Sequence, residues 1–191
     1  MNCCLGKRLI RALGYSALMT AALSTGLAAA SPAQRKKPEV IVITGRNFQF
    51  GVCIPEGWQG DTRHAPYYHA DLIFYPRGAG WKSTNPIIRV RLNRKADENT
   101  AADLEHDLEE YRKKSPQVQF EGLNVGNMWH RCFSKLVFVE GEFYDYITYI
   151  NPGPQYWYCF SVLMTGQKAR LDDKQLTAYR FVAATVQAMQ Y

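Results

Sequence analysis

The sequence is poor in charge, and the part that we expect to fold has no net charge. Charged residues make up 21% of the 191 residues, and the formal net charge of +6 comes from two short tracts near the N-terminus. These are Lys7, Arg8 and Arg11, and Arg35-Lys36-Lys37. From residue 38 onward, 17 Lys and Arg residues balance 17 Asp and Glu residues. A nucleic-acid-binding domain needs a basic face, so the composition argues against nucleic acid as a partner.

Long apolar runs are also scarce, because only the N-terminal one approaches the roughly 18 residues that a membrane span requires. That stretch, Ala12 to Ala29, follows the first positive tract and ends in the small residues Ala28-Ala29-Ala30, as a secretory signal peptide does. We expect cleavage after Ala30 or after Ala33. An uncleaved N-terminal anchor is the alternative. Cleavage would leave a periplasmic or secreted protein with no stable membrane insertion.

Cysteine is too scarce for a disulfide-rich scaffold, since only Cys53, Cys132 and Cys159 follow the signal peptide. If Glu140-Gly141 is a two-residue hairpin turn, Cys132 lies opposite Tyr149. Continuing this register places Cys159 two strands away, beyond the reach of a disulfide bond with Cys132. Cys53 could pair with either of the others, or all three could be unpaired thiols.

The order of periodic segments predicts one α+β domain over residues 39–191, preceded by a basic linker at 31–38. Residues 48–54 alternate apolar and other side chains as a half-buried strand does, and further strands are expected near 39–43, 68–75, 87–93 and in four segments from 118 to 165. Helices are expected after Thr100 and, with Asp172 and Gln175 as a capping pair, from there to Met189. The fold class is therefore a curved antiparallel sheet of about six strands flanked by two helices.

This order of elements resembles the PsbP-like and DcrB-like families. The residues that carry the resemblance are Pro55-Glu56-Gly57-Trp58, a corner that follows an aromatic-apolar strand. The resemblance covers about residues 40–189 and implies a curved antiparallel sheet with flanking helices. It also implies an accessory or binding role rather than catalysis, and the family has no fixed active site to carry over. The aromatic-rich region 58–86 is longer than the pattern needs.

Catalytic motifs are absent from the sequence, so we expect no catalytic residues, no metal site and no cofactor. The stretch 78–84 has Trp81 where a phosphate-binding loop needs glycine before its lysine, and no nucleophile elbow occurs. His64, His69, Asp71 and His130 match no established spacing of metal ligands. Cys132 with His130 is the nearest approach to a catalytic dyad, and a thiol- or metal-dependent hydrolase remains an alternative on that basis.

Aromatic residues are the feature that stands out, with 24 Phe, Tyr and Trp residues after residue 30. Consecutive rings on one strand must lie on both faces of the sheet, so one set is left for solvent or a partner unless the 58–86 segment covers it. Trp, Tyr and Arg dominate binding hot spots. The candidate binding residues are Arg77, Trp81, Tyr144, Tyr146, Tyr156 and Trp157.

These observations predict an exported, non-catalytic accessory domain that docks a protein partner in the cell envelope or outside the cell, through the 77–86 loop and the 142–158 hairpin. An inhibitor or immunity protein is one form of this hypothesis. The alternative is a periplasmic accessory protein that binds a small molecule or lipid, with the aromatic residues lining a pocket between sheet and helix.

Overall fold

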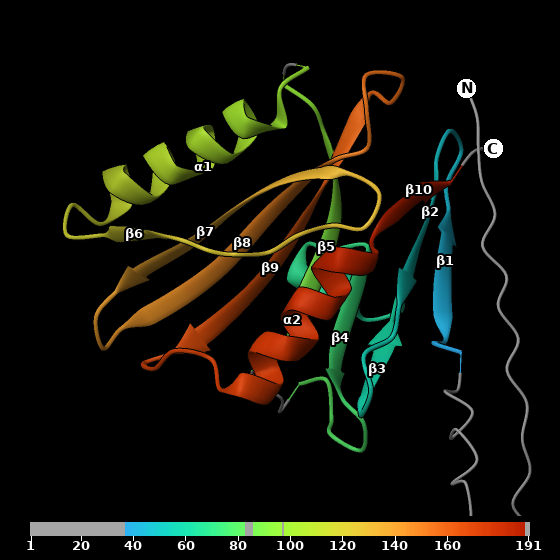
Figure 1. Cartoon of the computed structure of the whole chain (residues 1–191). Coiled ribbons are helices and arrows are strands. Elements are labelled where there is room, and N and C mark those ends of the chain that lie inside the picture. Colours follow the sequence, from blue (N-terminus) through green and yellow to red (C-terminus); the bar gives the residue numbers. More distant parts are fainter. Residues whose placement is uncertain (1–36, 83–85, 97, 190–191) are drawn as a thin grey trace, which may run out of the picture. The chain divides into compact units, whose positions relative to one another are not determined.

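The computed structural model describes residues 37–82, 86–96 and 98–189. The expected signal peptide and all but the last two residues of the expected linker lie outside these ranges. None of the helices in the described ranges is long and apolar enough to cross a membrane. The elements, in chain order, are β1 (Val40–Thr44), β2 (Gln49–Cys53), β3 (Trp58–Asp61), η1 (Ala65–Tyr68), β4 (Leu72–Pro76), β5 (Ile88–Arg94), α1 (Thr100–Lys114), β6 (Gln119–Gly122), β7 (Arg131–Val139), β8 (Phe143–Asn151), β9 (Tyr158–Gln167), α2 (Asp173–Thr185) and β10 (Gln187–Met189) (Figure 1).

Seven strands form the main antiparallel sheet, in the order β3-β4-β5-β9-β8-β7-β6. β7, β8 and β9 form a meander that occupies the half of the sheet next to β6, and the turn residues Asn151-Pro152-Gly153-Pro154 connect β8 to β9. The expected α+β class with two helices is confirmed. The sheet gains a strand at Trp58–Asp61, which pairs with β4 and begins at the Trp58 of the corner motif.

The two N-terminal strands do not join the main sheet but form a second, three-stranded sheet with β10, in the order β1-β2-β10. The helix that we expected to run to Met189 ends at Thr185, and the chain then pairs with β2, Ala188 opposite Phe50. The apolar residues Val186 and Met189 fit a helical stripe as well as a strand, so the sequence pattern does not distinguish the two. The chain forms a strand here because it pairs with the edge of β2, which lies far away in the sequence.

The main sheet is covered on both faces. Side chains of α2, such as Tyr179 and Val182, and of the inner face of the small sheet, such as Phe50, are fully buried in one core with Phe160 and Val162 of β9. A second core lies on the opposite face, where α1 packs on β7, β8 and β9, and a third lies under η1. Figure 1 shows α2 in front of the main sheet, beside the small sheet.

Both helices begin at polar caps. The Asp172 carboxylate accepts from the N–H of Gln175 at 2.8 Å, and the Gln175 side chain accepts from the N–H of Asp172 at 3.1 Å, so the expected capping pair is confirmed. The N-cap of α1 is Asn99, one residue before Thr100, and its side chain accepts from the N–H of Ala101. Thr100 instead is buried in the first turn.

The β7–β8 turn has one residue more than the sequence suggested. Val139 pairs with Phe143, so the loop contains three residues, with Gly141 at a φ of 76°. This places Cys132 opposite Ile150 and not opposite Tyr149. Glycine is needed here because a positive φ is strained for other residues.

Candidate functional site

A rigid loop between β6 and β7 presents two large apolar side chains to solvent, and Asn127 holds it in place. The Asn127 amide nitrogen donates to the carbonyls of Ala183 (2.7 Å) and Val186 (2.9 Å), and its oxygen accepts from the N–H groups of Trp129 and His130, both at 2.9 Å. These carbonyls belong to the end of α2, where helical partners run out. The loop and α2 therefore satisfy each other's polar groups.

The consequence is that Met128 and Trp129 are exposed although their backbone is fixed. Met128 is 69% exposed and Trp129 is 47% exposed. The N–H of Met128 also donates to the carbonyl of Ala184 at 3.0 Å, and His130 Nε2 accepts from the N–H of Ala188 at 3.2 Å. Because the loop is already ordered, a partner that contacts these side chains would lose little conformational entropy there.

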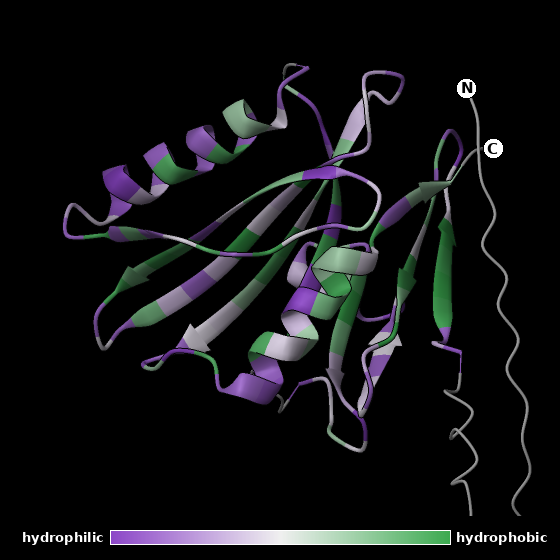
Figure 2. Cartoon of the chain, viewed as in Figure 1, coloured by the Kyte–Doolittle hydropathy of each residue, from purple (hydrophilic) through white to green (hydrophobic). Residues whose placement is uncertain are grey.

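Beside this loop, the outer face of the small sheet forms an apolar groove of about 420 Å³. Val42 pairs with Gly51 across the β1–β2 ladder, and because Gly51 has no side chain, Met189 and Val40 pack closely over its backbone, where a Cβ atom would lie 3.1 and 3.4 Å from them. Val40 and Val42 are each 48% exposed. Figure 2 shows β1 as hydrophobic along its length. The groove is lined by Pro38, Val40, Gly51, Cys53, Met128, Trp129, Phe181, Thr185, Gln187 and Met189.

Met189 also lines a second hollow, of about 350 Å³, so the two hollows adjoin. Its other lining residues are Asn47, Phe48, Gln155, Tyr156, Trp157 and Tyr158. Trp157 is 51% exposed, while Tyr156 is half-buried and its ring lies tilted against that of Tyr158, with the ring centroids 5.3 Å apart. We call the combined area around the groove and this hollow the apolar surface, defined by Val40, Val42, Gly51, Met128, Trp129, Trp157 and Met189.

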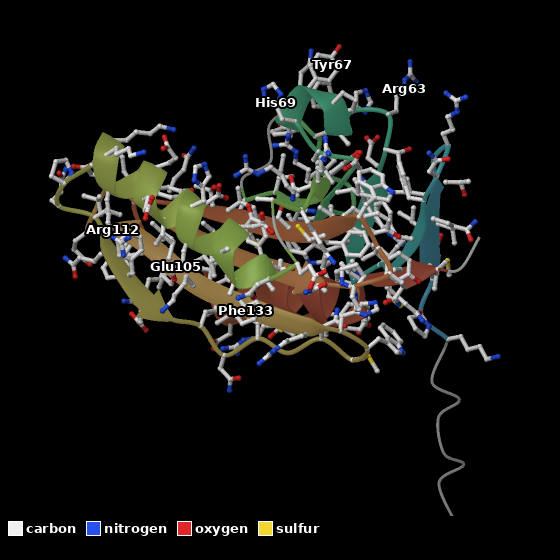
Figure 3. All side chains as sticks on the ribbon, turned by 90° about the horizontal axis from the view of Figure 1, so that it is seen from above. Arg63, Tyr67, His69, Glu105, Arg112 and Phe133 are labelled. Carbon is white, nitrogen blue, oxygen red and sulfur yellow. The ribbon has the colours of Figure 1, made fainter. Side chains whose placement is uncertain are left out.

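Trp81, another predicted binding residue, belongs to a separate aromatic cluster with His64 and Tyr67. The His64 and Trp81 rings stack with centroids 4.3 Å apart, and Tyr67 lies 5.1 Å from Trp81. Tyr67 is well exposed, and Figure 3 shows it projecting from the η1 side of the sheet near Arg63 and His69. Lys82 lies over the Trp81 ring at 5.1 Å, as a cation–π contact.

Asp61 fixes the orientation of this cluster. Its carboxylate lies 2.6 Å from His64 Nδ1 and accepts from the Tyr75 hydroxyl at 3.0 Å. Burial raises the pKa of Asp61, but the hydrogen bonds from His64 and Tyr75 outweigh it, so the pKa lies below its ordinary value of 3.8. Asp61 therefore stays ionised and holds the His64 ring against Trp81.

The six predicted binding residues divide among three places. Arg77 is exposed on the loop after β4, and Trp81 is half-buried on the same loop. This loop and the Tyr156–Trp157 hairpin lie at opposite ends of the sheet, because Ile88 pairs with Met164 and Arg94 with Tyr158. Six residues of strand separate those two pairs, roughly 20 Å.

Tyr144 and Tyr146 are each only 3% exposed. The Tyr144 ring stacks on Phe138, and the Tyr146 hydroxyl accepts from the N–H of Leu171 at 3.1 Å. The rings on the other face of β8 are also covered, since Tyr149 donates to Asp107 of α1 at 2.6 Å. The structure thus places these rings in packed layers.

Cys132 and His130 each have a separate partner. The Cys132 thiol donates to the carbonyl of Val125 at 3.2 Å, and burial raises its pKa, so the thiol is protonated at neutral pH. His130 Nε2 is occupied by the N–H of Ala188, and burial lowers the pKa of His130 below 6.5. Neither group is prepared for nucleophilic catalysis.

The three cysteines of the described ranges are all free, with Cys53 and Cys132 partly exposed and Cys159 buried. Among the described residues, no group of three or more His, Cys, Asp and Glu side chains is arranged to hold a metal ion.

Met128, Trp129, Val40 and Val42 were missed as candidates from the sequence. Trp129 falls within a segment that the pattern predicts to be a strand, where an aromatic side chain is expected to pack. One available signal was Gly126-Asn127, a turn dipeptide that interrupts that pattern. For β1, the continuous run Val40–Ile43 shows that both faces are apolar, but the sequence could not reveal that only one of them is covered.

No protein-family model matches the sequence, and no curated protein matches it. Among solved structures, LpqN, involved in cell envelope biogenesis of Mycobacterium tuberculosis, is 13% identical with a TM-score of 0.50, over 81% of this chain and 93% of LpqN. Cyanobacterial PsbP (CyanoP) from Synechocystis is 14% identical with a TM-score of 0.47, over 84% of this chain and 99% of CyanoP. At such identities the similarity concerns the fold alone, and at that level the LpqN match confirms the fold that the resemblance seen in the sequence implies.

Proposed function

We propose that this protein is an exported, non-catalytic accessory domain of the cell envelope that docks a protein partner through the apolar surface. The observation that carries the proposal is the loop that Asn127 fixes, with Met128 and Trp129 exposed beside the groove. Contiguous exposed apolar area is uncommon on monomeric soluble proteins and marks interaction sites. An ordered loop with a Trp and a Met is the kind of anchor that contributes most to binding.

The placement in the envelope is supported by the expected signal peptide and by the fold. LpqN, which has a similar fold, is a protein of cell envelope biogenesis. An accessory protein of this kind acts by contact, and its partner would be an envelope or secreted protein. An inhibitor or immunity role is one version of such a contact.

The test uses the full-length chain with a C-terminal tag, so that export and any processing proceed as in the cell. Stoichiometric partners are captured from envelope extract and culture supernatant, and the affinity of the purified pair is measured by calorimetry. Trp129→Ala, Trp157→Ala and Trp81→Ala are then compared, because Trp129 and Trp157 lie in the two hollows of the apolar surface, whereas Trp81 lies in the separate aromatic cluster. We expect Trp129→Ala to weaken binding at least about tenfold, as truncation of a hot-spot Trp does.

Each tryptophan serves as a control for the others. A loss with Trp129→Ala and Trp157→Ala, but not with Trp81→Ala, would support the apolar surface. A loss confined to Trp81→Ala would place the interface at the aromatic cluster with Arg77, as the sequence alone suggested. If all three variants bound with unchanged affinity, docking through exposed aromatic residues would be wrong.

A second candidate function, binding of a small molecule or lipid, rests on the hollow beside Trp157. Tyr158 lines this hollow and is 1% exposed, yet its buried hydroxyl has no hydrogen-bond partner among the described residues. A buried hydroxyl without a partner costs free energy, which a ligand with an acceptor atom could recover. Native mass spectrometry of gently purified protein should then show a retained adduct, whereas a clean unliganded mass would count against this function.

A further inference from the structure

β1 ends the small sheet with an open edge. The strand order is β1-β2-β10, so no described strand pairs with the far side of β1. Its inner side chains, Ile41 and Ile43, pack on the core, and Ile41 lies directly against Gly60 of β3. The strand is therefore fixed in position, although one of its edges has no partner strand among the described residues.

The backbone groups that face this open edge can be identified from the β1–β2 ladder. The carbonyl of Glu39 accepts from the N–H of Ile54 at 2.8 Å, and the N–H of Gly45 donates to Phe48 at 2.9 Å. In an antiparallel ladder the N–H and C=O of one residue point to the same side, and neighbours point to opposite sides. Residues 39, 41, 43 and 45 therefore face β2, and Val40, Val42 and Thr44 direct their N–H and C=O groups outward.

This edge lacks the features that normally prevent pairing. The strand sequence Val40-Ile41-Val42-Ile43-Thr44 contains no charge and no proline. Natural edge strands are usually protected by such residues, by bulges or by covering segments. Within the part of the chain that the structure describes, the outward donors and acceptors of these five residues have no partner strand, so the edge can accept an added strand, a common mode of peptide recognition.

The charge around the edge indicates what kind of strand would bind. Lys37 and Arg46 flank β1 and are exposed, and from residue 37 to residue 46 they are countered only by the single acid Glu39. If a second copy of this chain paired antiparallel with β1, centred on Val42, Lys37 would lie opposite Asn47 of the partner subunit. Arg46 of the partner subunit would then be next to Lys37, and the two cations would repel each other. A segment with acidic residues at its ends avoids this repulsion.

We propose that β1 adds a strand from the protein partner: an extended segment of about five residues with alternating apolar side chains and acidic residues at its ends. The proposal rests on the proposed function and specifies its mode of binding. The added strand would extend the small sheet, and its outer side chains would continue the apolar surface beyond Val40 and Val42.

The probe is a seven-residue peptide of alternating valine and threonine with an aspartate at each end, titrated into the exported full-length protein labelled with ¹⁵N. We expect saturable shifts of the amide signals of Val40, Val42 and Thr44, and slowed hydrogen exchange of these three amides. A peptide with lysines in place of the aspartates should bind at least about tenfold more weakly.

Two substitutions at one position separate strand addition from side-chain docking. Val42→Pro removes an outward N–H without removing a β1–β2 hydrogen bond, whereas Val42→Thr keeps the N–H and removes apolar surface. We expect Val42→Pro to weaken peptide binding at least about tenfold and Val42→Thr to change it less than threefold. Thermal unfolding of each variant checks the fold, and the titration of the unaltered protein needs no variant.

Several outcomes would overturn the inference. These are absence of peptide binding, equal losses with both variants, shifts confined to Met128 and Trp129, or protection of Val40, Val42 and Thr44 before peptide is added. The last would mean that a second copy or another segment of the chain occupies the edge. If the captured partner is lost with Trp129→Ala and retained with Val42→Pro, the inference fails while the proposed function stands. If neither variant affects that partner, both fail.

Discussion

Asn127 determines the position of the exposed side chains of the candidate site, although its own side chain is partly buried. Its amide makes all four of its hydrogen bonds to backbone groups, two at the end of α2 and two in its own loop. Sequence reasoning selected Trp157 because consecutive rings on a strand must point to both faces of the sheet, and this side chain is exposed. It could not select Trp129, whose exposure depends on contacts between residue 127 and residues 183–186.

We predict that Asn127→Ala lowers the free energy of unfolding by about 1–3 kcal/mol, because it leaves backbone groups without partners. It should also weaken partner binding, since Met128 and Trp129 would no longer be held in place. Urea denaturation and calorimetry measure the two effects. Asn124→Ala, at an exposed position in the same loop, is the matched control. Equal stability of the two variants would contradict the role assigned to Asn127.

At the scale of the element, the sequence predicted those features that depend on neighbouring residues alone, such as helix caps, strand alternation and turns. The capping pair Asp172 and Gln175, the alternation of β2 and β5, and the turn at 151–154 were all visible in the sequence. Pairing partners were not visible. β10 is a strand because β2 offers an edge, and the register of β7 with β8 depends on a three-residue turn where two residues were expected.

Two strand glycines give an element-scale prediction with its own control. A Cβ atom at Gly166 of β9 would lie 2.5 Å from the backbone carbonyl oxygen of Ala169, whereas one at Gly122 of β6 would have nothing within 4 Å. Backbone cannot move aside as a side-chain end can. We therefore expect Gly166→Ala to cost about 1–3 kcal/mol of unfolding free energy, as overpacking does, and Gly122→Ala to cost much less. Similar melting temperatures would refute the close approach at Gly166.

On the scale of the whole molecule, the layers explain why aromatic content alone did not reveal which of the rings are exposed. The sequence left open whether the second face of the sheet is covered. α1 covers β7, β8 and β9, and η1 with Trp81 covers part of β4, so Tyr149 and Tyr75 are buried. The exposed apolar area around Val40 and Val42 lies on the outer face of the small sheet, which a strand from the far end of the chain completes.

The same layers predict a definite order of thiol reactivity. Cys159 lies in the core under α1, where burial raises its pKa to about 12, while Cys132 is partly exposed but hydrogen-bonded to the carbonyl of Val125. Cys53 lines the open groove. Because the thiolate is the reactive form, native protein at pH 8 should be alkylated first at Cys53, more slowly at Cys132, and at Cys159 only after unfolding.

Peptide mapping of timed iodoacetamide reactions measures this order, and urea-unfolded protein, in which all three thiols should react alike, is the control. Reductant should leave the melting temperature unchanged, since the three thiols are free. An intact mass lower by two hydrogens would show a disulfide that the fold does not contain. Early alkylation of Cys159 would mean that α1 separates from the sheet under native conditions, so that the second core would be less stable than its burial implies.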